Sequence, residues 1–145
     1  MESRLNNSAV GIRLLRWSLA VVFIWFGALK VAGYNPVFDL IHNSMAPMLA
    51  SGIGLTGLGI FECVIGLLLL CNRAILLAHL LLALHLLGTF STFIFGWHIM
   101  FTPAFPILSL AGEFVVKNLT LVIAGLVVLV HESRRRRLLQ SVLKR

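Results

Sequence analysis

Four long apolar segments divide the chain, and each has the length that a membrane-spanning helix needs. They cover residues 12–32, 53–71, 74–96 and 109–130. A helix that crosses the hydrocarbon core requires about 20 apolar residues, so the pattern predicts an all-α membrane protein, a four-helix transmembrane bundle. We expect residues 1–145 to form one four-span domain. The stretch 17–29 also has the length of a signal-peptide core, but Lys30 follows it and no A-x-A cleavage site is apparent, which favours a retained span.

The composition excludes the two other common classes of protein. Hydrophobic residues make up 59% of the 145 residues and charged residues only 12%, whereas soluble domains carry roughly 25% charged residues. Such a chain has too little polar surface to cover a globule in water, and a disordered chain needs low hydrophobicity. Lipid is therefore expected to be the main solvent of the fold.

The basic residues predict the orientation of the bundle. The net charge is +7. The side of the bundle that holds both termini carries ten basic residues: Arg4, Arg13, Arg16, Arg73, Arg134, Arg135, Arg136, Arg137, Lys144 and Arg145. The loops on the other side, 33–52 and 97–108, contain no Lys or Arg. By the positive-inside rule both termini are expected in the cytoplasm. A basic run beside a span typically contacts anionic lipid, so we expect lipid, and no nucleic acid, at 134–137.

Segments outside the spans show an interfacial pattern. Asn35 and Pro36 match an N-cap followed by proline at the first helical position, which predicts a short interfacial helix in the first outer loop. The second outer loop is aromatic, as is typical of headgroup depth. Apolar residues recur at helical spacing among the basic residues of 131–145, which predicts an amphipathic tail lying on anionic lipid. They are Leu138, Leu139, Val142 and Leu143.

Ionisable residues inside the apolar segments are the candidate functional residues, because a charge at the centre of a spanning helix costs ~2.5–3.5 kcal/mol. They are Lys30, Glu62, His85, Glu113 and Lys117. Helical spacing places each on one polar stripe of its span. His79 points away from the stripe of His85 and is expected near the cytoplasmic interface.

Small residues share these stripes and predict close helix packing. The second span carries Gly52, Gly59, Cys63 and Gly66, and the first carries Gly27. Small residues at this spacing let helices approach closely in lipid. We therefore expect the four stripes to face one another around a polar seam.

Depth along the helices divides the ionisable residues into two groups. Glu62 and His85 are expected near the membrane midplane, and Lys117, ~5 Å nearer the outer face, completes a central set with them. Lys30 and Glu113 are expected as an outer pair, ~10 Å or more outward at 1.5 Å per residue. Glu113 and Lys117 are also i, i+4 neighbours. The charges balance, so the network either fixes helix register or serves a ligand or proton path. The pattern allows both interpretations.

Other chemistry is weakly represented. Imidazole with thioether suits copper, but no spacing in the outer loops is diagnostic of a metal site, and methionine often fills apolar interfaces. The weak candidates are His42, Met45, Met48 and His98. Cys63 and Cys71 are eight residues apart, which is ~12 Å on a helix and too far for a disulfide.

Three motifs in order resemble those of the DUF417 family of membrane proteins, within the broader DoxX-like group. They are WFGALK at 25–30, E-x-x-x-G at 62–66 and P-x-L-S-x-x-G-x-x-x-x-K at 106–117. Asn118 stands where the family pattern usually has Asp, so a role of that Asp does not carry over. The resemblance implies a four-helix bundle of the bacterial inner membrane, a link to oxidative or reactive-chlorine stress, and quinone as a cofactor.

Three functions are consistent with these features. The seam would hold a quinone or lipid head, or dock a partner oxidoreductase, in a small accessory protein; this is the hypothesis we favour. In an enzyme, Lys30 or Lys117 would donate a proton to a quinone oxygen, relayed by His85 or Glu62. No haem, flavin or iron–sulfur signature supports catalysis. In a small transporter or proton pathway, four helices would be few unless the chain forms a homo-oligomer.

Overall fold

The computed structural model describes residues 2–72 and 74–143. The elements of this part of the chain are α1 (Glu2–Val31), α2 (Phe38–His42), the 3-10 helix η1 (Pro47–Ala50), α3 (Gly52–Cys71), α4 (Ile75–Phe90), α5 (Thr92–Phe95), α6 (Trp97–Met100) and α7 (Leu110–Leu143). Among these residues there is no β-strand, and only an isolated bridge joins Phe101 to Leu108. The all-α prediction is confirmed.

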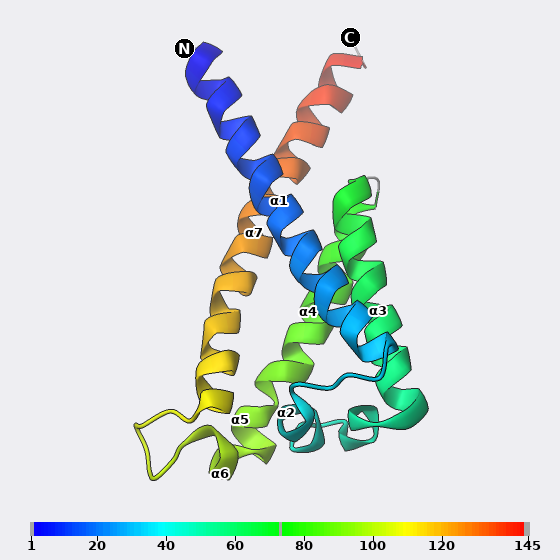
Figure 1. Ribbon diagram of the computed structural model, residues 1–145. Helices are drawn as coiled ribbons and strands as arrows, with labels where there is room; N and C mark the ends of the chain where they lie inside the picture. The colour runs from blue at the N-terminus through cyan, green and yellow to red at the C-terminus, as the bar shows by residue number, and fades with distance from the viewer. Residues whose placement is uncertain (1, 73, 144–145) are drawn as a thin grey trace.

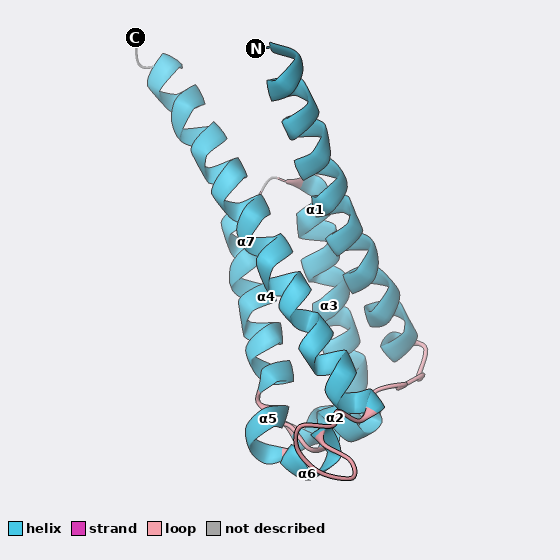
Figure 2. Cartoon of the chain, turned by 90° about the vertical axis from the view of Figure 1, so that its left-hand side faces the viewer, coloured by secondary structure: helices cyan, strands magenta, loops and turns pink. Residues whose placement is uncertain are grey.

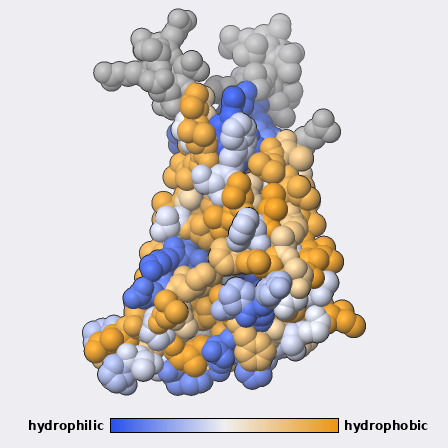
Figure 3. Space-filling model, in the orientation of Figure 1, coloured by the Kyte–Doolittle hydropathy of each residue, from blue (hydrophilic) through white to orange (hydrophobic). Residues whose placement is uncertain are grey.

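In the described part of the chain, four helical stretches are long and apolar enough to cross a membrane. They are Ala9–Val31, Gly52–Cys71, Ile75–Phe95 and Leu110–Arg136. Large apolar side chains cover their outer surface; Val21, Leu80 and Leu87, for example, are 60%, 60% and 65% exposed. On the face shown in Figure 3, hydrophobic residues form a broad band with hydrophilic patches above and below it. The chain is therefore a multi-pass helical membrane protein.

The four long helices pack as a ring in the order α1, α3, α4, α7 (Figure 1). The most extensive contact between two helices is that of α1 with α3. Both termini lie at the same end, where α1 and α7 extend beyond the other helices (Figure 2). We call this the basic end, because it holds Arg13 and residues 134–136. The opposite end, formed by α2, η1, α5 and α6, is called the loop end.

Glycine residues allow α1 and α3 to approach closely. A Cβ atom on Gly27 would lie 2.6 Å from the carbonyl oxygen of Gly59 and 2.7 Å from Sγ of Cys63. A Cβ atom on Gly66 would lie 2.8 Å from the carbonyl oxygen of Ala20. Backbone therefore packs on backbone over two turns of α3, as small residues permit in lipid.

Apolar, mostly aliphatic side chains fill the half of the bundle nearer the basic end. All four long helices contribute to this core: Leu19, Ala20, Phe23, Ile65, Leu69, Ile75, Ala78, Leu82, Leu86, Ala124 and Val128. A smaller cluster of Leu40, Met100 and Val115 joins α2, α6 and α7 at the loop end. The region between the two cores contains the candidate site.

Arginine side chains cap α3 at the basic end. Nη1 of Arg16 donates hydrogen bonds to the carbonyl oxygens of Leu69, at 2.6 Å, and Leu70, at 3.1 Å. Carbonyl groups in the last turn of a helix have no partner within it. Arg136 of α7 donates to the carbonyl of Asn72. Arg16, counted in the sequence as a loop cation, is thus a buried structural residue, 7% exposed.

Two predictions about the loop end are wrong. Asn35 caps no helix: its Nδ2 donates to the carbonyl oxygen of Ala50, at 2.6 Å, and α2 begins later, at Phe38. Gly52 is not a packing residue, since its φ is +57° and nothing lies within 4 Å of a Cβ built there. Gly52 is the first residue of α3, and its positive φ is a backbone conformation that favours glycine. No neighbouring helix packs against it.

The basic tail continues α7, which runs unbroken from Leu110 to Leu143. No Gly or Pro lies between residues 126 and 143 to end the helix. The tail is thus helical, as predicted, and belongs to the same helix as the fourth span; its contact with anionic lipid stays a prediction. Arg73, Lys144 and Arg145 lie outside the described residues, and so do the side chains of Arg4, Arg137, Leu138, Leu139, Val142 and Leu143.

Candidate functional site

Lys30 and Glu62 form an ion pair buried between α1 and α3. Nζ of Lys30 lies 2.7 Å from Oε2 and 3.0 Å from Oε1 of Glu62, and each side chain is 4% exposed. Each residue follows a glycine of the helix contact, Gly27 or Gly59, by three positions. The close approach of the two backbones therefore brings the two charges side by side. A charge buried here without a partner would be strongly destabilising.

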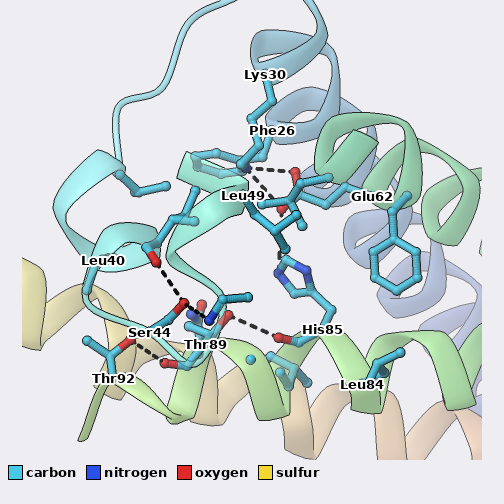
Figure 4. Close-up of a pocket in the computed structure, with 18 of the residues that line it drawn as sticks. Phe26, Lys30, Leu40, Ser44, Leu49, Glu62, Leu84, His85, Thr89 and Thr92 are labelled. Carbon is cyan, nitrogen blue, oxygen red and sulfur yellow. Dashed lines mark hydrogen bonds and ion pairs between the residues drawn. The ribbon is translucent and has the colours of Figure 1, made fainter. Parts of the chain in front are cut away.

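His85 of α4 joins this pair, and we call Lys30, Glu62 and His85 the polar triad. Nε2 of His85 lies 3.6 Å from Oε1 of Glu62, slightly beyond hydrogen-bond distance. Figure 4 shows Lys30 and His85 reaching Glu62 from different sides. The imidazole packs edge-on against Phe23, with ring centroids 5.2 Å apart, and near Phe61, at 6.4 Å. These rings hold the imidazole in place.

The polar triad lies in the wall of a cavity of about 480 Å³. Such a volume is within the range of small-molecule sites, roughly 300–1,000 Å³. The rest of the wall is mainly apolar and comes from all four long helices: Val22, Phe23, Phe26, Leu58, Phe61, Leu84, Leu86, Phe114 and Leu121. Residues 37–49, which we call the cover segment, line it as well. Figure 4 shows Leu49 of this segment beside Lys30 and Glu62, with Leu40 and Ser44 further along the wall.

Hydroxyl groups add further polar atoms to the cavity wall. The Oγ1 of Thr89 donates to the carbonyl of His85 at 3.2 Å, and that of Thr92 donates to the carbonyl of Thr89 at 2.8 Å. Ser44 of the cover segment donates to the carbonyl of Ile41 at 2.7 Å. Each hydroxyl hydrogen is used locally, so what these groups still offer is mainly acceptor capacity.

Asn118 of α7 also lines the cavity, but Glu113 and Lys117 do not. Nζ of Lys117 lies 2.9 Å from Oε2 of Glu113, and the side chains are 74% and 51% exposed. The prediction that Lys117 joins Glu62 in a central set is therefore wrong. Helical periodicity identifies residues that share a face, but it does not say which way that face turns.

The depth of Lys30 was also predicted incorrectly. The sequence placed Lys30 in an outer layer with Glu113, yet Lys30 contacts Glu62, in the middle of α3. The reason is that α1 ends beside the middle of α3, short of the loop end, and α2 and η1 form a further layer beyond its end (Figure 1). Counting residues from the centre of each span gives the same depth in the membrane only if the helices begin and end at the same depth.

His79 is buried, although the sequence indicated an interface position. It is 7% exposed, and Nδ1 lies 2.7 Å from the carbonyl oxygen of Ile75. A Cβ atom on Gly125 of α7 would lie 3.9 Å from its Cδ2. The ring thus fills space between α4 and α7, apart from the polar triad.

The weak metal candidates show no arrangement of ligands. The His42 ring stacks on Phe38, with centroids 5.5 Å apart, Met48 is 78% exposed, and His98 is exposed on α6. The backbone N–H of Met45 donates to Oγ of Ser91 at 2.9 Å, which ties the cover segment to α4. Within the described residues no group of three His, Cys, Asp or Glu side chains is close enough to hold a metal ion.

The aromatic side of the cavity was not predicted from the sequence. Phe26 and Phe114 make a T-shaped contact between α1 and α7, with centroids 6.1 Å apart. Nζ of Lys30 lies 5.7 Å from the Phe26 centroid, within the range of a cation–π interaction. Phe26 precedes Lys30 by four positions, and Phe114 precedes Asn118 by four. Because residues four apart lie on the same face of a helix, this spacing could have predicted that both phenylalanines lie beside the polar residues.

No protein-family model, curated protein or solved structure matches this chain. The function is therefore inferred from the geometry and chemistry of the cavity.

Proposed function

We propose that this protein is a small accessory component of oxidative or reactive-chlorine stress defence in the bacterial inner membrane, and that its cavity binds a quinone. The observation that carries the proposal is the polar triad in the wall of an otherwise apolar cavity. Small-molecule sites typically combine an apolar wall with a few polar groups that orient the ligand. A ligand that reaches this cavity from lipid must be largely apolar and carry a compact polar head.

The residues of the cavity fit a quinone head. The ammonium of Lys30 has three N–H donors, and its two contacts to Glu62 leave one hydrogen for a carbonyl oxygen. A neutral His85 ring has one further N–H. Phe23, Phe26 and Phe61 provide flat apolar surfaces for the ring. When bound, a quinone would supply reversible redox chemistry coupled to protonation of its carbonyl oxygens.

The balance of charge favours a neutral head over a lipid phosphate. Lys30 and Glu62 neutralise each other, and the lining of the cavity contains no arginine and no other lysine among the described residues. Phosphate groups are usually held by basic side chains that have charge to spare. Lys117 does not line the cavity; it pairs with Glu113 and is 74% exposed. A quinone therefore matches the wall better than a phospholipid head.

Catalysis at the same group is the second candidate. Lys30, Glu62 and His85 form a short chain of ionisable groups, with 3.6 Å between the last two, and such a chain is suited to moving a proton toward a bound carbonyl. A pathway across the whole membrane is less favoured. The core between the triad and the basic end is aliphatic, through residues such as Leu19, Ile65 and Leu82.

We further propose that the basic end faces the cytoplasm. Arg13, Arg134 and Arg135 are exposed there, whereas 33–52 and 97–108 contain no Lys or Arg. The positive-inside rule then places both termini in the cytoplasm. The exposed arginines are positioned to contact anionic lipid heads.

A titration in nanodiscs of zwitterionic lipid tests the proposed ligand. The probes are a short-tailed benzoquinone and a hydrocarbon of the same tail and ring that lacks the carbonyl oxygens. We expect the quinone to bind about tenfold more tightly, which corresponds to about 1.4 kcal/mol, because only the quinone accepts hydrogen bonds from the triad. Because His85→Leu removes one of the two donors, it should clearly reduce this difference. His98→Leu, the same change on exposed α6, should preserve it. Equal affinity of the two probes for the unmodified protein would rule out a quinone site.

A further inference from the structure

The outer surface of α7 carries two charges within a membrane-spanning segment. Glu113 and Lys117 belong to the span Leu110–Arg136, and their side chains are 51% and 74% exposed. If the hydrocarbon begins at Val130, beside the arginines, ~30 Å at 1.5 Å per residue reaches about residue 110. Lys117 then lies about two turns inside the hydrocarbon, at the same rise per residue.

In the part of the chain that the structure describes, the other spans carry no exposed charge at a comparable depth, since Arg13 of the first span lies at the basic end. Within the described residues, the segments 17–29, 53–71 and 75–90 expose no Lys, Arg, Asp or Glu side chain. Their charged residue, Glu62, is buried and paired. Charged side chains in membrane spans usually face a protein interior or a water-filled cavity. The charged face of α7 is therefore expected to be covered by protein.

The same face has the pattern of a helix-packing seam. Residues at alternating spacings of three and four are all exposed along α7: Glu113, Val116, Thr120, Ile123, Val127 and Val130. This period of 3.5 residues keeps one seam turned toward a partner helix. The β-branched residues among them have few rotamers to lose on packing.

We propose that two copies of this chain pair through this face of α7, side by side in the same orientation, about a two-fold axis normal to the membrane. A two-fold interface joins the same patch on both copies, so the patch must be self-complementary. Glu113 and Lys117 meet this condition, because each copy offers one carboxylate and one ammonium a single turn apart. The two pairs together form a neutral four-charge cluster shielded from lipid.

Cysteine cross-linking in native membranes tests the pairing. In a Cys63→Ala/Cys71→Ser background, Val127→Cys places a thiol on the seam, and Leu126→Cys places one about 100° around the helix at the same depth. The two native side chains are 42% and 51% exposed. We expect an oxidised dimer from Val127→Cys and little from Leu126→Cys. Equal yields from both positions, or none from either, would overturn the interface.

A charge exchange then tests the cluster itself. Glu113→Lys alone should lower the cross-linked fraction of Val127→Cys roughly tenfold, since it brings four positive charges together. The exchange Glu113→Lys/Lys117→Glu should restore cross-linking, because it keeps the self-complementary arrangement. Restored cross-linking also shows that the chain still folds. If Glu113→Lys leaves the yield unchanged, or the exchange fails to restore it, the charges do not join two copies.

Discussion

A Cβ atom built on Gly59 of α3 would lie 2.6 Å from the carbonyl oxygen of Gly27 in α1, and one built on Gly27 would lie 2.6 Å from the carbonyl oxygen of Gly59. This reciprocal contact sets the register of the two helices. Lys30 and Glu62 each follow one of these glycines by three positions, so the register that the glycines permit also aligns the ion pair. The candidate site therefore depends on a helix contact that has no room for a side chain.

Gly59→Ala is expected to lower the thermal stability of the purified protein. The added methyl group meets backbone that cannot move aside, and overpacking of this kind costs ~1–3 kcal/mol. Gly57→Ala, two positions away, is the matched control, because nothing lies within 4 Å of a Cβ at Gly57. It should be neutral or slightly stabilising. Equal melting temperatures for the two variants in detergent would show that the α1–α3 contact is looser than described.

Removing one partner of the buried ion pair should lower the stability of the protein strongly, and removing both partners should lower it only slightly. Lys30→Met or Glu62→Gln alone leaves an unmatched or poorly paired buried group, at a cost of up to ~3–5 kcal/mol for a lone charge. Lys30→Met/Glu62→Leu replaces the pair by apolar side chains and should recover most of the melting temperature.

The same cycle identifies the partner of Glu62. In the native protein Nζ of Lys117 lies 2.9 Å from Oε2 of Glu113, whereas Glu62 pairs with Lys30. Adding Lys117→Met to Glu62→Gln should therefore rescue nothing. Rescue by Lys117→Met in place of Lys30→Met would contradict the pairing.

Arg16→Met is expected to destabilise the basic end. It removes hydrogen bonds from a buried guanidinium to two carbonyl groups at the end of α3, and hydrogen bonds of charged groups contribute ~1.5–3 kcal/mol. Arg13→Met, at an exposed position one turn earlier, is the control and should change the melting temperature little. Similar losses for both variants would indicate that net charge, and not the cap, is responsible.

The sequence was sufficient to predict the parts of the fold that follow from solvent and length. The four apolar segments correspond to the helices that can span a membrane, because a helix satisfies the backbone of an apolar segment of this length within the segment itself. The sequence also singled out Lys30, Glu62 and His85, since ionisable residues are rare in spans. That these three residues contact one another could not be predicted, because it depends on where each helix ends.

The direction in which each helix face turns could not be predicted. Glu113 and Lys117 share a stripe, as the periodicity indicated, but the stripe faces outward. Nothing in a single span states which neighbour it packs against; that depends on contacts among all four helices. Asn35 shows the same limit on a smaller scale, because its partner is the carbonyl of Ala50, fifteen residues away.

The orientation can be measured by cysteine labelling of intact cells, in the Cys63→Ala/Cys71→Ser background. Thr102→Cys lies exposed at the loop end and Arg134→Cys exposed at the basic end. With the positive side in the cytoplasm, an impermeant maleimide should label Thr102→Cys in intact cells and Arg134→Cys only after lysis. The reverse pattern would place the termini outside.

The central claim is that the polar triad holds a quinone in the cavity. It is tested most directly by mass spectrometry of lipids that co-purify with the protein in mild detergent. Unmodified protein and His98→Leu should retain a quinone in about equimolar amount, while His85→Leu and the stable double variant Lys30→Met/Glu62→Leu should lose most of it. Absence of quinone from the unmodified protein, or equal amounts in all four proteins, would contradict the account.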